Sequence, residues 1–269
     1  MLGLLAGLKS LTVPVTGAPE GVAQDPISGV YLLLMIGVAT GLMLLLLKFK
    51  KNFLISAWFY SAIFLTMLVF FSVFVSAPLA IAITLTLFLT RYFTDELGLR
   101  NIIDMFSFAG AGALFGTMIG FVPALIFLFV LAIYDIISVF VTGHMIDLAK
   151  GGLSTDTFMG IVFADEEIPD ETEAKDMEVP ESSESEGEVK EAGISIVGGG
   201  DVIAPMILSV SLLKNFPLYS SVMTSLGSVV GLLVLMNYKS EKQFLPAIPT
   251  VAGFAVLGFL LSLPLVIFI

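Results

Sequence analysis

The sequence has no cysteine and a single histidine, His144, among its 269 residues. Without cysteine there is no disulfide, no thiol nucleophile and no cysteine-ligated metal. One histidine excludes a His-rich zinc site, and no H-E-x-x-H pattern occurs. His144 lies at a predicted helix end with no G-x-S-x-G turn to accompany it, so we interpret it as a loop residue rather than the partner of a serine nucleophile. We expect neither a metal nor another cofactor.

Charge is also scarce. Charged residues make up 13% of the chain and hydrophobic residues 57%, whereas a soluble domain carries about 25% charge. Several apolar runs exceed the roughly 18–20 residues that a helix needs to cross a bilayer. The composition therefore predicts a protein embedded in a lipid bilayer.

The formal net charge of -11 belongs to one segment. Residues 164–191 hold 13 of the 23 acidic residues and two of the 12 basic ones, so the rest of the chain carries ten of each sign. The acidity therefore indicates no acidic membrane face, and no nucleic-acid partner is expected. A segment so rich in Glu, Ser, Asp and Pro buries too little apolar surface to offset the entropy of ordering, so we expect it to be disordered.

Apolar runs broken by charges, prolines and glycines predict an all-α polytopic protein with about nine transmembrane helices. The predicted spans are 1–16, 28–47, 53–75, 77–93, 101–119, 121–142, 194–213, 217–237 and 246–269. This divides the chain into a six-helix part (1–142), a hydrophilic loop (143–193) and a three-helix part (194–269). Glycines four residues apart, at 112, 116 and 120 and at 227 and 231, predict close helix packing.

The basic residues predict an orientation. With nine spans and a cytoplasmic N-terminus, most lysines and arginines fall on the cytoplasmic side, where such residues are enriched. They are Lys48, Lys50, Lys51, Arg91, Arg100, Lys150, Lys239 and Lys242, against Lys214 on the other side. We therefore expect the N-terminus and the 143–193 loop to face the cytoplasm, with the chain in the cell membrane.

Three aspartates lie within predicted spans, where an ionisable side chain is costly and indicates function. Asp104 is close to Arg100 and to the predicted membrane edge, so we interpret it as interfacial. Asp135 and Asp201 each lie about seven residues inside consecutive antiparallel spans, or roughly 10 Å deep at 1.5 Å per residue. Their similar depth suggests that the two carboxylates face each other.

Two facing carboxylates in a poorly solvated place share one proton and titrate as a unit. Aspartic proteases use this arrangement. The ionised member removes a proton from water, and the protonated member donates a hydrogen bond to the scissile carbonyl. Such chemistry needs no metal, thiol or histidine.

Glycines precede the second aspartate, and prolines lie at the start of the last span. Gly198, Gly199 and Gly200 precede Asp201, weaken a helix start and leave room for backbone, to which an extended substrate could add as a strand. Pro246 and Pro249 remove two backbone donors and are expected to keep the start of the last span non-helical or kinked. That start could be a simple connecting loop or a substrate-facing wall.

Taken in order, Tyr134-Asp135, Gly198-Gly199-Gly200-Asp201 and Pro246-Ala247-Ile248 resemble the Tyr-Asp, Gly-x-Gly-Asp and Pro-Ala-Leu motifs of the presenilin and signal peptide peptidase family. Ile248 replaces the leucine of the last motif. The nine spans and the long loop after the sixth also match, and the small size is similar to a microbial presenilin homologue. The basic-residue pattern favours the presenilin orientation over its inverse.

The resemblance implies an intramembrane aspartyl protease that cuts transmembrane helical substrates, with Asp135 and Asp201 catalytic. It implies that the other motif residues shape the site and substrate access: Tyr134, Gly198, Gly199, Gly200, Pro246, Ala247 and Ile248. It does not imply obligate partner subunits, and homo-oligomerisation stays open. The alternatives are a proton-coupled transporter, for which no internal repeat is visible, and a non-catalytic membrane chaperone or insertase.

Overall fold

The computed structural model describes residues 1–12, 52–94, 96–138, 160–164, 194–237 and 246–268, with isolated positions between 34 and 45. Within these residues there are eight α-helices, one 3-10 helix and one pair of strands. The helices are α1 (Leu2–Thr12), α3 (Asn52–Ser72), α4 (Ala77–Phe93), α5 (Leu97–Met118), α6 (Phe121–Ile137), α8 (Gly199–Ser211), α9 (Leu218–Asn237) and α10 (Ala247–Phe268). The all-α polytopic prediction is confirmed. The predicted span 28–47 lies almost wholly outside the described residues.

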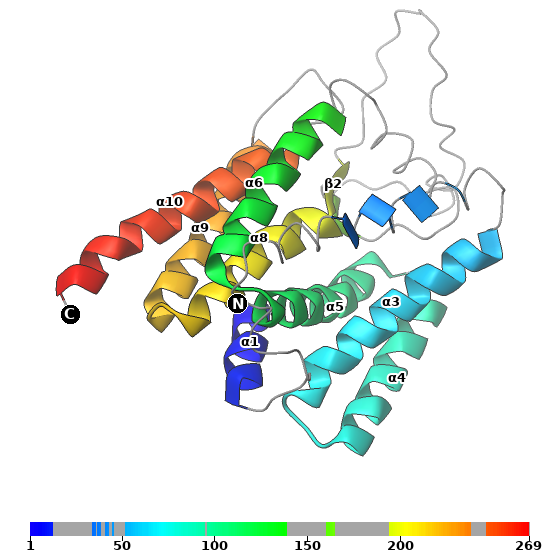
Figure 1. Ribbon diagram of the computed structural model, residues 1–269. Helices are drawn as coiled ribbons and strands as arrows, with labels where there is room; N and C mark the ends of the chain where they lie inside the picture. Colours follow the sequence, from blue (N-terminus) through cyan, green and yellow to red (C-terminus); the bar gives the residue numbers. More distant parts are fainter. Residues whose placement is uncertain are drawn as a thin grey trace, which may run out of the picture.

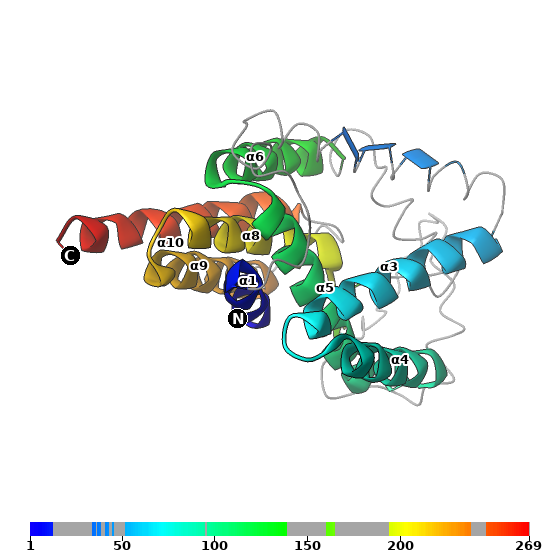
Figure 2. The same ribbon diagram turned by 60° about the horizontal axis from the view of Figure 1, so that its bottom comes forward.

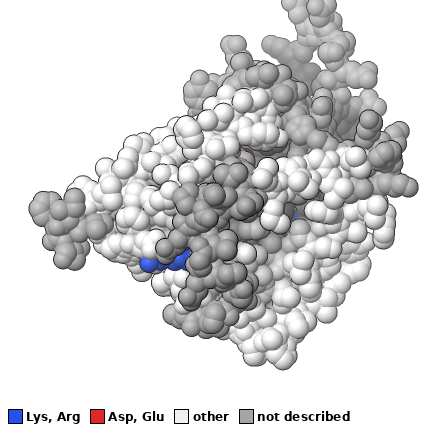
Figure 3. Space-filling view, viewed as in Figure 1, with Lys and Arg blue, Asp and Glu red and all other residues white. Residues whose placement is uncertain are grey.

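Three of the described helices are long and apolar enough to cross a membrane: Phe53–Ser72, Leu218–Asn237 and Ala247–Pro264. Three shorter helices are also apolar: Leu2–Leu11, Ala77–Phe93 and Phe121–Ile137. Their outward faces carry large hydrophobic side chains, such as Phe53 and Leu261. The face in Figure 3 is almost free of charged side chains over its described part. Such a surface suits contact with lipid rather than water.

The helices form two groups that meet at α5 (Figures 1 and 2). Helices α3 and α4 pack on one side of α5, and α8 packs on the other. Helix α1 contacts both α5 and α8, while α6, α9 and α10 surround the remaining faces of α8. The short helix α8 is therefore enclosed by packed helices, and it carries one of the two candidate aspartates.

The largest buried apolar cluster joins α6, α8 and α10. Its buried members are Ile119, Ala124, Phe127, Leu128, Ala204, Ile207, Leu208, Ile248, Ala252 and Ala255. Leu131 and Ala132, one turn before Asp135, pack against it, as does Ile203, close to Asp201. This cluster fixes the three helices that position the candidate site.

The prediction that residues 194–213 form one helix is wrong at its start. Residues Ile194–Gly198 form strand β2, which pairs antiparallel with β1 (Gly160–Ala164) in the register Gly160↔Gly198 to Ala164↔Ile194. The β-branched residues in Ile-Ser-Ile-Val favour a strand. Helix α8 therefore begins at Gly199, and Asp201 lies in its first turn rather than seven residues inside.

Strand β1 lies within the predicted hydrophilic loop 143–193, and its last residue is the first of the acidic segment 164–191. Residues Gly160–Ala164 are ordered by their pairing with β2. The remaining residues of the loop, with nearly all of its acidic segment, lie outside the described residues. The loop therefore contributes a strand that pairs with β2, the segment directly before the candidate site.

The interpretation of Asp104 as interfacial is also wrong. Asp104 is 3% exposed, and both of its carboxylate oxygens accept hydrogen bonds from Arg91 of α4, at 2.5 and 3.1 Å. The Arg91 guanidinium also lies over the rings of Phe59 and Tyr60, 5.3 and 5.8 Å from their centroids. Arg91 is thus part of a buried ion pair and not a solvated charge at the membrane edge.

The glycine repeats pack closely, as predicted. Gly227 and Gly231 of α9 approach the backbone of α10 at Phe254 and Val251, where a side chain would have no room. Gly112 and Gly116 of α5 approach side chains of α8. Gly120, the third member of the α5 repeat, precedes the first residue of α6 instead.

Candidate active site

Asp135 lies in the last turn of α6 and is held by the start of another helix. Its carboxylate accepts a hydrogen bond from the backbone N–H of Ile248 at 3.1 Å and a further one from Ala247. The first N–H groups of a helix have no partner within the helix. Because α10 begins at Ala247 and Pro249 has no N–H, Asp135 accepts from the first two residues of α10 and caps it from outside.

Asp201 caps the helix to which it belongs. It is the third residue of α8, whose N-cap is Gly198, and its carboxylate accepts a hydrogen bond from the Gly198 backbone N–H. This is the return contact of a capping box, in which the third helical residue reaches back to the N-cap. A Cβ on Gly198 would lie 3.2 Å from the Asp201 carboxylate. The absence of a side chain at Gly198 therefore leaves room for the Asp201 carboxylate.

The two carboxylates are near enough for their charges to interact. Helices α8 and α10 both begin at this point, so the positive ends of two helix dipoles face the pair. In the described part of the chain, neither aspartate has a basic partner, and the ion pair found is Arg91–Asp104. The backbone N–H groups stabilise one negative charge on the pair. A second negative charge would be repelled by the first.

The structure brings most of the predicted site residues together. Ala247 and Ile248 are buried and hold Asp135, and Pro246 directly precedes them. Pro246 lies before α10 and is not helical, as expected, whereas Pro249 lies in the first turn of α10, where no internal N–H bond is lost. Gly198 and Gly199 adjoin Asp201, with Gly199 buried.

Two predicted residues, each next to an aspartate in the sequence, are exposed. Gly200 is exposed, and no atom lies within 4 Å of where its Cβ would be. Tyr134 is 45% exposed on α6 beside Asp135. Both stand where an incoming chain could reach them.

Sequence reasoning missed the donors that hold Asp135. They are backbone N–H groups, which leave no trace in residue type. Two prolines around a short Ala-Ile segment are a usable signal, because proline is common at a helix start and a helix start has free N–H groups. Pro205 was missed as well: it lacks the N–H that would bond the Asp201 carbonyl, so the backbone at Asp201 keeps a free acceptor.

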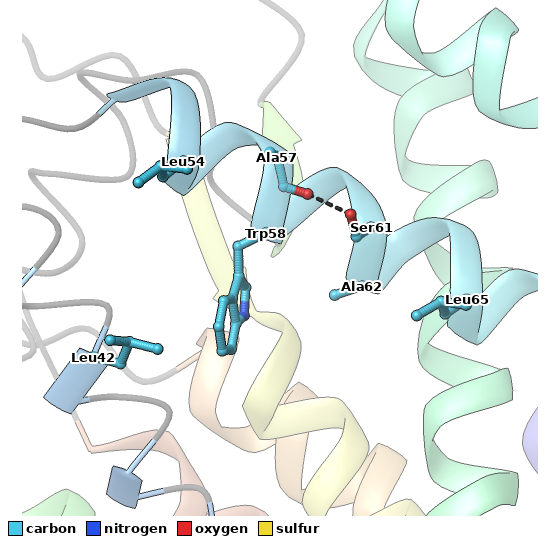
Figure 4. A pocket seen from close by; sticks show the side chains of 7 residues that line it. All are labelled: Leu42, Leu54, Ala57, Trp58, Ser61, Ala62 and Leu65. Carbon is cyan, nitrogen blue, oxygen red and sulfur yellow. Dashed lines mark hydrogen bonds between the residues drawn. The ribbon is translucent and has the colours of Figure 1, made fainter.

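No group of three or more His, Asp or Glu side chains within the described residues is placed to hold a metal ion. One cavity of about 540 Å³ lies beside α3, and Leu54, Trp58, Leu65 and Leu42 line it (Figure 4). The hydroxyl of Ser61 in its wall is bonded to the carbonyl of Ala57 at 2.6 Å. The described residues that line this cavity are apolar apart from Ser61 and the indole N–H of Trp58, and none of them is ionisable.

A helical membrane fold that brings together one aspartate at the end of α6 and another at the start of α8 is consistent with an intramembrane aspartyl protease. The sequence model of the family described as signal-peptide peptidase, presenilin aspartyl protease matches residues 8–267. The chain therefore belongs to this family and is an aspartic endopeptidase of the intramembrane-cleaving kind.

Two solved structures of a presenilin family intramembrane aspartate protease, in space groups P2 and C222, share this fold. The first is 24% identical with a TM-score of 0.64, covering 98% of this chain and 95% of that one. The second is 23% identical with a TM-score of 0.63, covering 97% and 92%. A search of curated protein sequences finds no match.

Proposed function

We infer that this chain hydrolyses peptide bonds within or near transmembrane segments of other proteins, with Asp135 and Asp201 as a catalytic dyad that activates water. The observation that carries the proposal is the geometry of the two carboxylates. They interact with each other, are held by backbone N–H groups of two helix starts, and have no basic partner in the described part of the chain.

In this mechanism one carboxylate is ionised and the other protonated. The ionised carboxylate takes a proton from water as the oxygen attacks the scissile carbonyl carbon. The protonated carboxylate donates a hydrogen bond to the carbonyl oxygen, which becomes the hydroxyl of a tetrahedral intermediate. Collapse of that intermediate breaks the C–N bond as a proton passes to the leaving nitrogen, giving a carboxylic acid and an amine.

The sheet β1–β2 is the proposed platform for substrate. A helical substrate must unwind before its carbonyls can be attacked, because they are hydrogen-bonded within the helix. Among the described residues the sheet has two strands, so each strand has one edge without a strand partner there, and β2 leads directly into Gly199, Gly200 and Asp201. An unwound segment that adds to this sheet has its backbone bonded and its scissile bond near the dyad.

The proposal also covers location and partners. The N-terminus and the 143–193 loop face the cytoplasm, and the chain resides in the cell membrane with single-span helices as substrates. The support is the distribution of basic residues, from which Arg91 is now removed because it is buried in an ion pair. Partner subunits are not required by this proposal, which leaves homo-oligomerisation open.

The test is cleavage of a single-span membrane substrate by the purified chain in detergent, with the cut located by mass spectrometry. The expected cut lies in or beside the apolar segment and is blocked by a transition-state-mimicking aspartyl protease inhibitor. Asp135→Asn and Asp201→Asn should each abolish it. Cleavage by both folded variants at the wild-type rate would refute the dyad and would direct attention to proton-coupled transport in liposomes.

A further inference from the structure

We propose that α1 and α5 hold α8 in a clasp that sets the position of Asp201, so that residues remote from the dyad act as positioning residues for catalysis. The proposal rests on the proposed role of Asp201. The α8 clasp consists of two side chains of α8 and four glycines that face them: Met206 and Val210 with Gly3, Gly7, Gly112 and Gly116.

Met206 forms the first level of the clasp. A Cβ on Gly112 of α5 would lie 2.5 Å from the Met206 sulfur and 2.7 Å from its Cγ. A Cβ on Gly3 of α1 would meet the same sulfur from the other side. Met206 therefore occupies a space that exists only because both neighbours are glycine.

Val210, one turn further along α8, forms the second level. A Cβ on Gly116 of α5 would lie 2.6 Å from Val210 Cβ, and one on Gly7 of α1 would lie 2.6 Å from Val210 Cγ1. Methionine can rotate away from such contacts, but valine is stiff at χ1 and fully buried here. A side chain at either glycine therefore displaces the helix itself.

A hydrogen bond closes the clasp at the next turn. Lys214, in the 3-10 helix η2 (Leu212–Lys214) that continues α8, donates from Nζ to the backbone carbonyl of Thr117. Thr117 follows Gly116 near the end of α5. The end of α8 is thus tied to the end of α5 by side-chain packing and by a hydrogen bond.

The clasp lies on the opposite face of α8 from the dyad. At about 100° per residue, Met206 is about 140° around the helix from Asp201, whereas Leu208 returns to within about 20° of it. Leu208 is fully buried in the cluster shared with α6 and α10, the helices that hold Asp135. Helix α8 is therefore pressed toward α6 and α10 by the clasp behind it, and a shift at the clasp moves Asp201.

Helix α8 needs this support because its own backbone is weak at the start. It begins with Gly199 and Gly200, and Pro205 removes the N–H that would bond the Asp201 carbonyl. The first turn therefore lacks an internal hydrogen bond at the residue whose position matters most. Contacts with other helices must supply the rigidity that the helix lacks.

The test is a substitution with a matched rescue. Gly7→Ala should lower kcat about tenfold or more with KM little changed, because a misplacement of about 1 Å can cost as much as 100-fold. Val210→Ala removes the two nearest atoms that the new methyl group would meet and leaves Leu213 Cδ1, at 3.3 Å, which is the end of a flexible side chain. Gly7→Ala/Val210→Ala should therefore recover most of the rate. Gly253→Ala in α10 makes the same change where no atom lies within 4 Å and should have no effect.

Two readouts separate positioning from loss of folded protein. The rate is expressed per folded, monodisperse molecule, and the pH profile of kcat is compared. A change in the separation of the two carboxylates changes how strongly they interact, so the width of the bell should change in Gly7→Ala and return to the wild-type width in the double variant. A folded Gly7→Ala with wild-type kcat and wild-type profile would overturn the clasp while leaving the dyad intact.

A distance measurement tests the proposed clasp without relying on protease activity. The chain has no cysteine, so spin labels can be placed at Ile133→Cys on α6 and Gly200→Cys on α8, both exposed. Gly7→Ala should shift the distance between the labels, and Val210→Ala in the same chain should restore it. An unchanged distance would overturn the clasp even if the chain proved not to be a protease.

Discussion

The aspartates of the two helical groups lie in opposite surroundings. Asp104, between α4 and α5, is matched by Arg91 through two hydrogen bonds, and the arginine is further placed over aromatic rings. Asp135 and Asp201 meet each other and only backbone N–H groups. The same side chain, equally buried in Asp104 and Asp135, is neutralised in one place and left with a like charge in the other.

The difference separates a structural carboxylate from a reactive one. In the ion pair, both carboxylate oxygens of Asp104 are turned toward the guanidinium of Arg91 rather than toward a substrate. A pair of carboxylates without a cation must retain a proton between them, which is the state that acid–base catalysis uses. The presence or absence of a cation, rather than burial, distinguishes the two roles.

The largest effect is expected at the dyad. Asp135→Asn and Asp201→Asn should each lower kcat by about 1,000-fold or more, and the double variant should be little worse than either, because residues that act as a unit are not additive. Rates of cleavage per folded molecule measure this. Two losses that simply multiply would show independent roles and contradict a shared dyad.

The opposite pattern is expected at Asp104. Asp104→Asn leaves Arg91 buried without a counter-charge, which costs about 3–5 kcal/mol of stability. Thermal unfolding in detergent should show the loss, with kcat per folded molecule near that of the wild type. Arg91→Met/Asp104→Leu should regain most of the stability. Full stability with lost catalysis in Asp104→Asn would reverse the assignment of the two sites.

A smaller effect tests the backbone donors at Asp135. Ala247→Pro places proline at the first residue of α10, where it is well tolerated, and removes one of the two N–H groups that hold Asp135. A hydrogen bond to a charged group contributes about 1.5–3 kcal/mol, so kcat should fall roughly 10- to 100-fold. Ala247→Ser keeps the N–H and serves as the control. Equal rates in both variants would show that the Ala247 N–H does not contribute to catalysis.

The smallest effect is expected from the acidic segment. Deleting 165–191 joins Ala164 to Ala192-Gly193-Ile194, which leaves a two-residue connection between strands already paired at Ala164↔Ile194. Two residues are the commonest length for a β-hairpin loop. The deletion should leave folding intact and cleavage within about twofold of the wild type. Failure to assemble in the membrane would show that the segment has a structural role.

The sequence predicts the helical layout well because apolar length and charged breaks report directly on a bilayer. Helices α3, α4 and α10 fall within a few residues of the predicted spans. Asp135 and Asp201 could be selected because each is an isolated charge in an apolar run. The glycine repeats likewise indicated close packing before any partner was known.

The remaining features depend on long-range contacts that no local pattern encodes. The sequence places Asp104 close to Arg100, yet the ion-pair partner of Asp104 is Arg91 on another helix. The strand Ile194–Gly198 is apolar enough to pass for a helix start, and only pairing with Gly160–Ala164 makes it extended. The donors to Asp135 come from the backbone of α10, 113 residues away in sequence.

The most direct measurement of the shared proton is kcat/KM for cleavage as a function of pH. With one proton on the dyad, the rate should rise as the first proton leaves the pair and fall as the second leaves, giving a bell. Asp104→Asn should keep the same bell, because that carboxylate takes no part. A rate that is flat from acid to alkali, or a bell that changes with Asp104, would contradict the account.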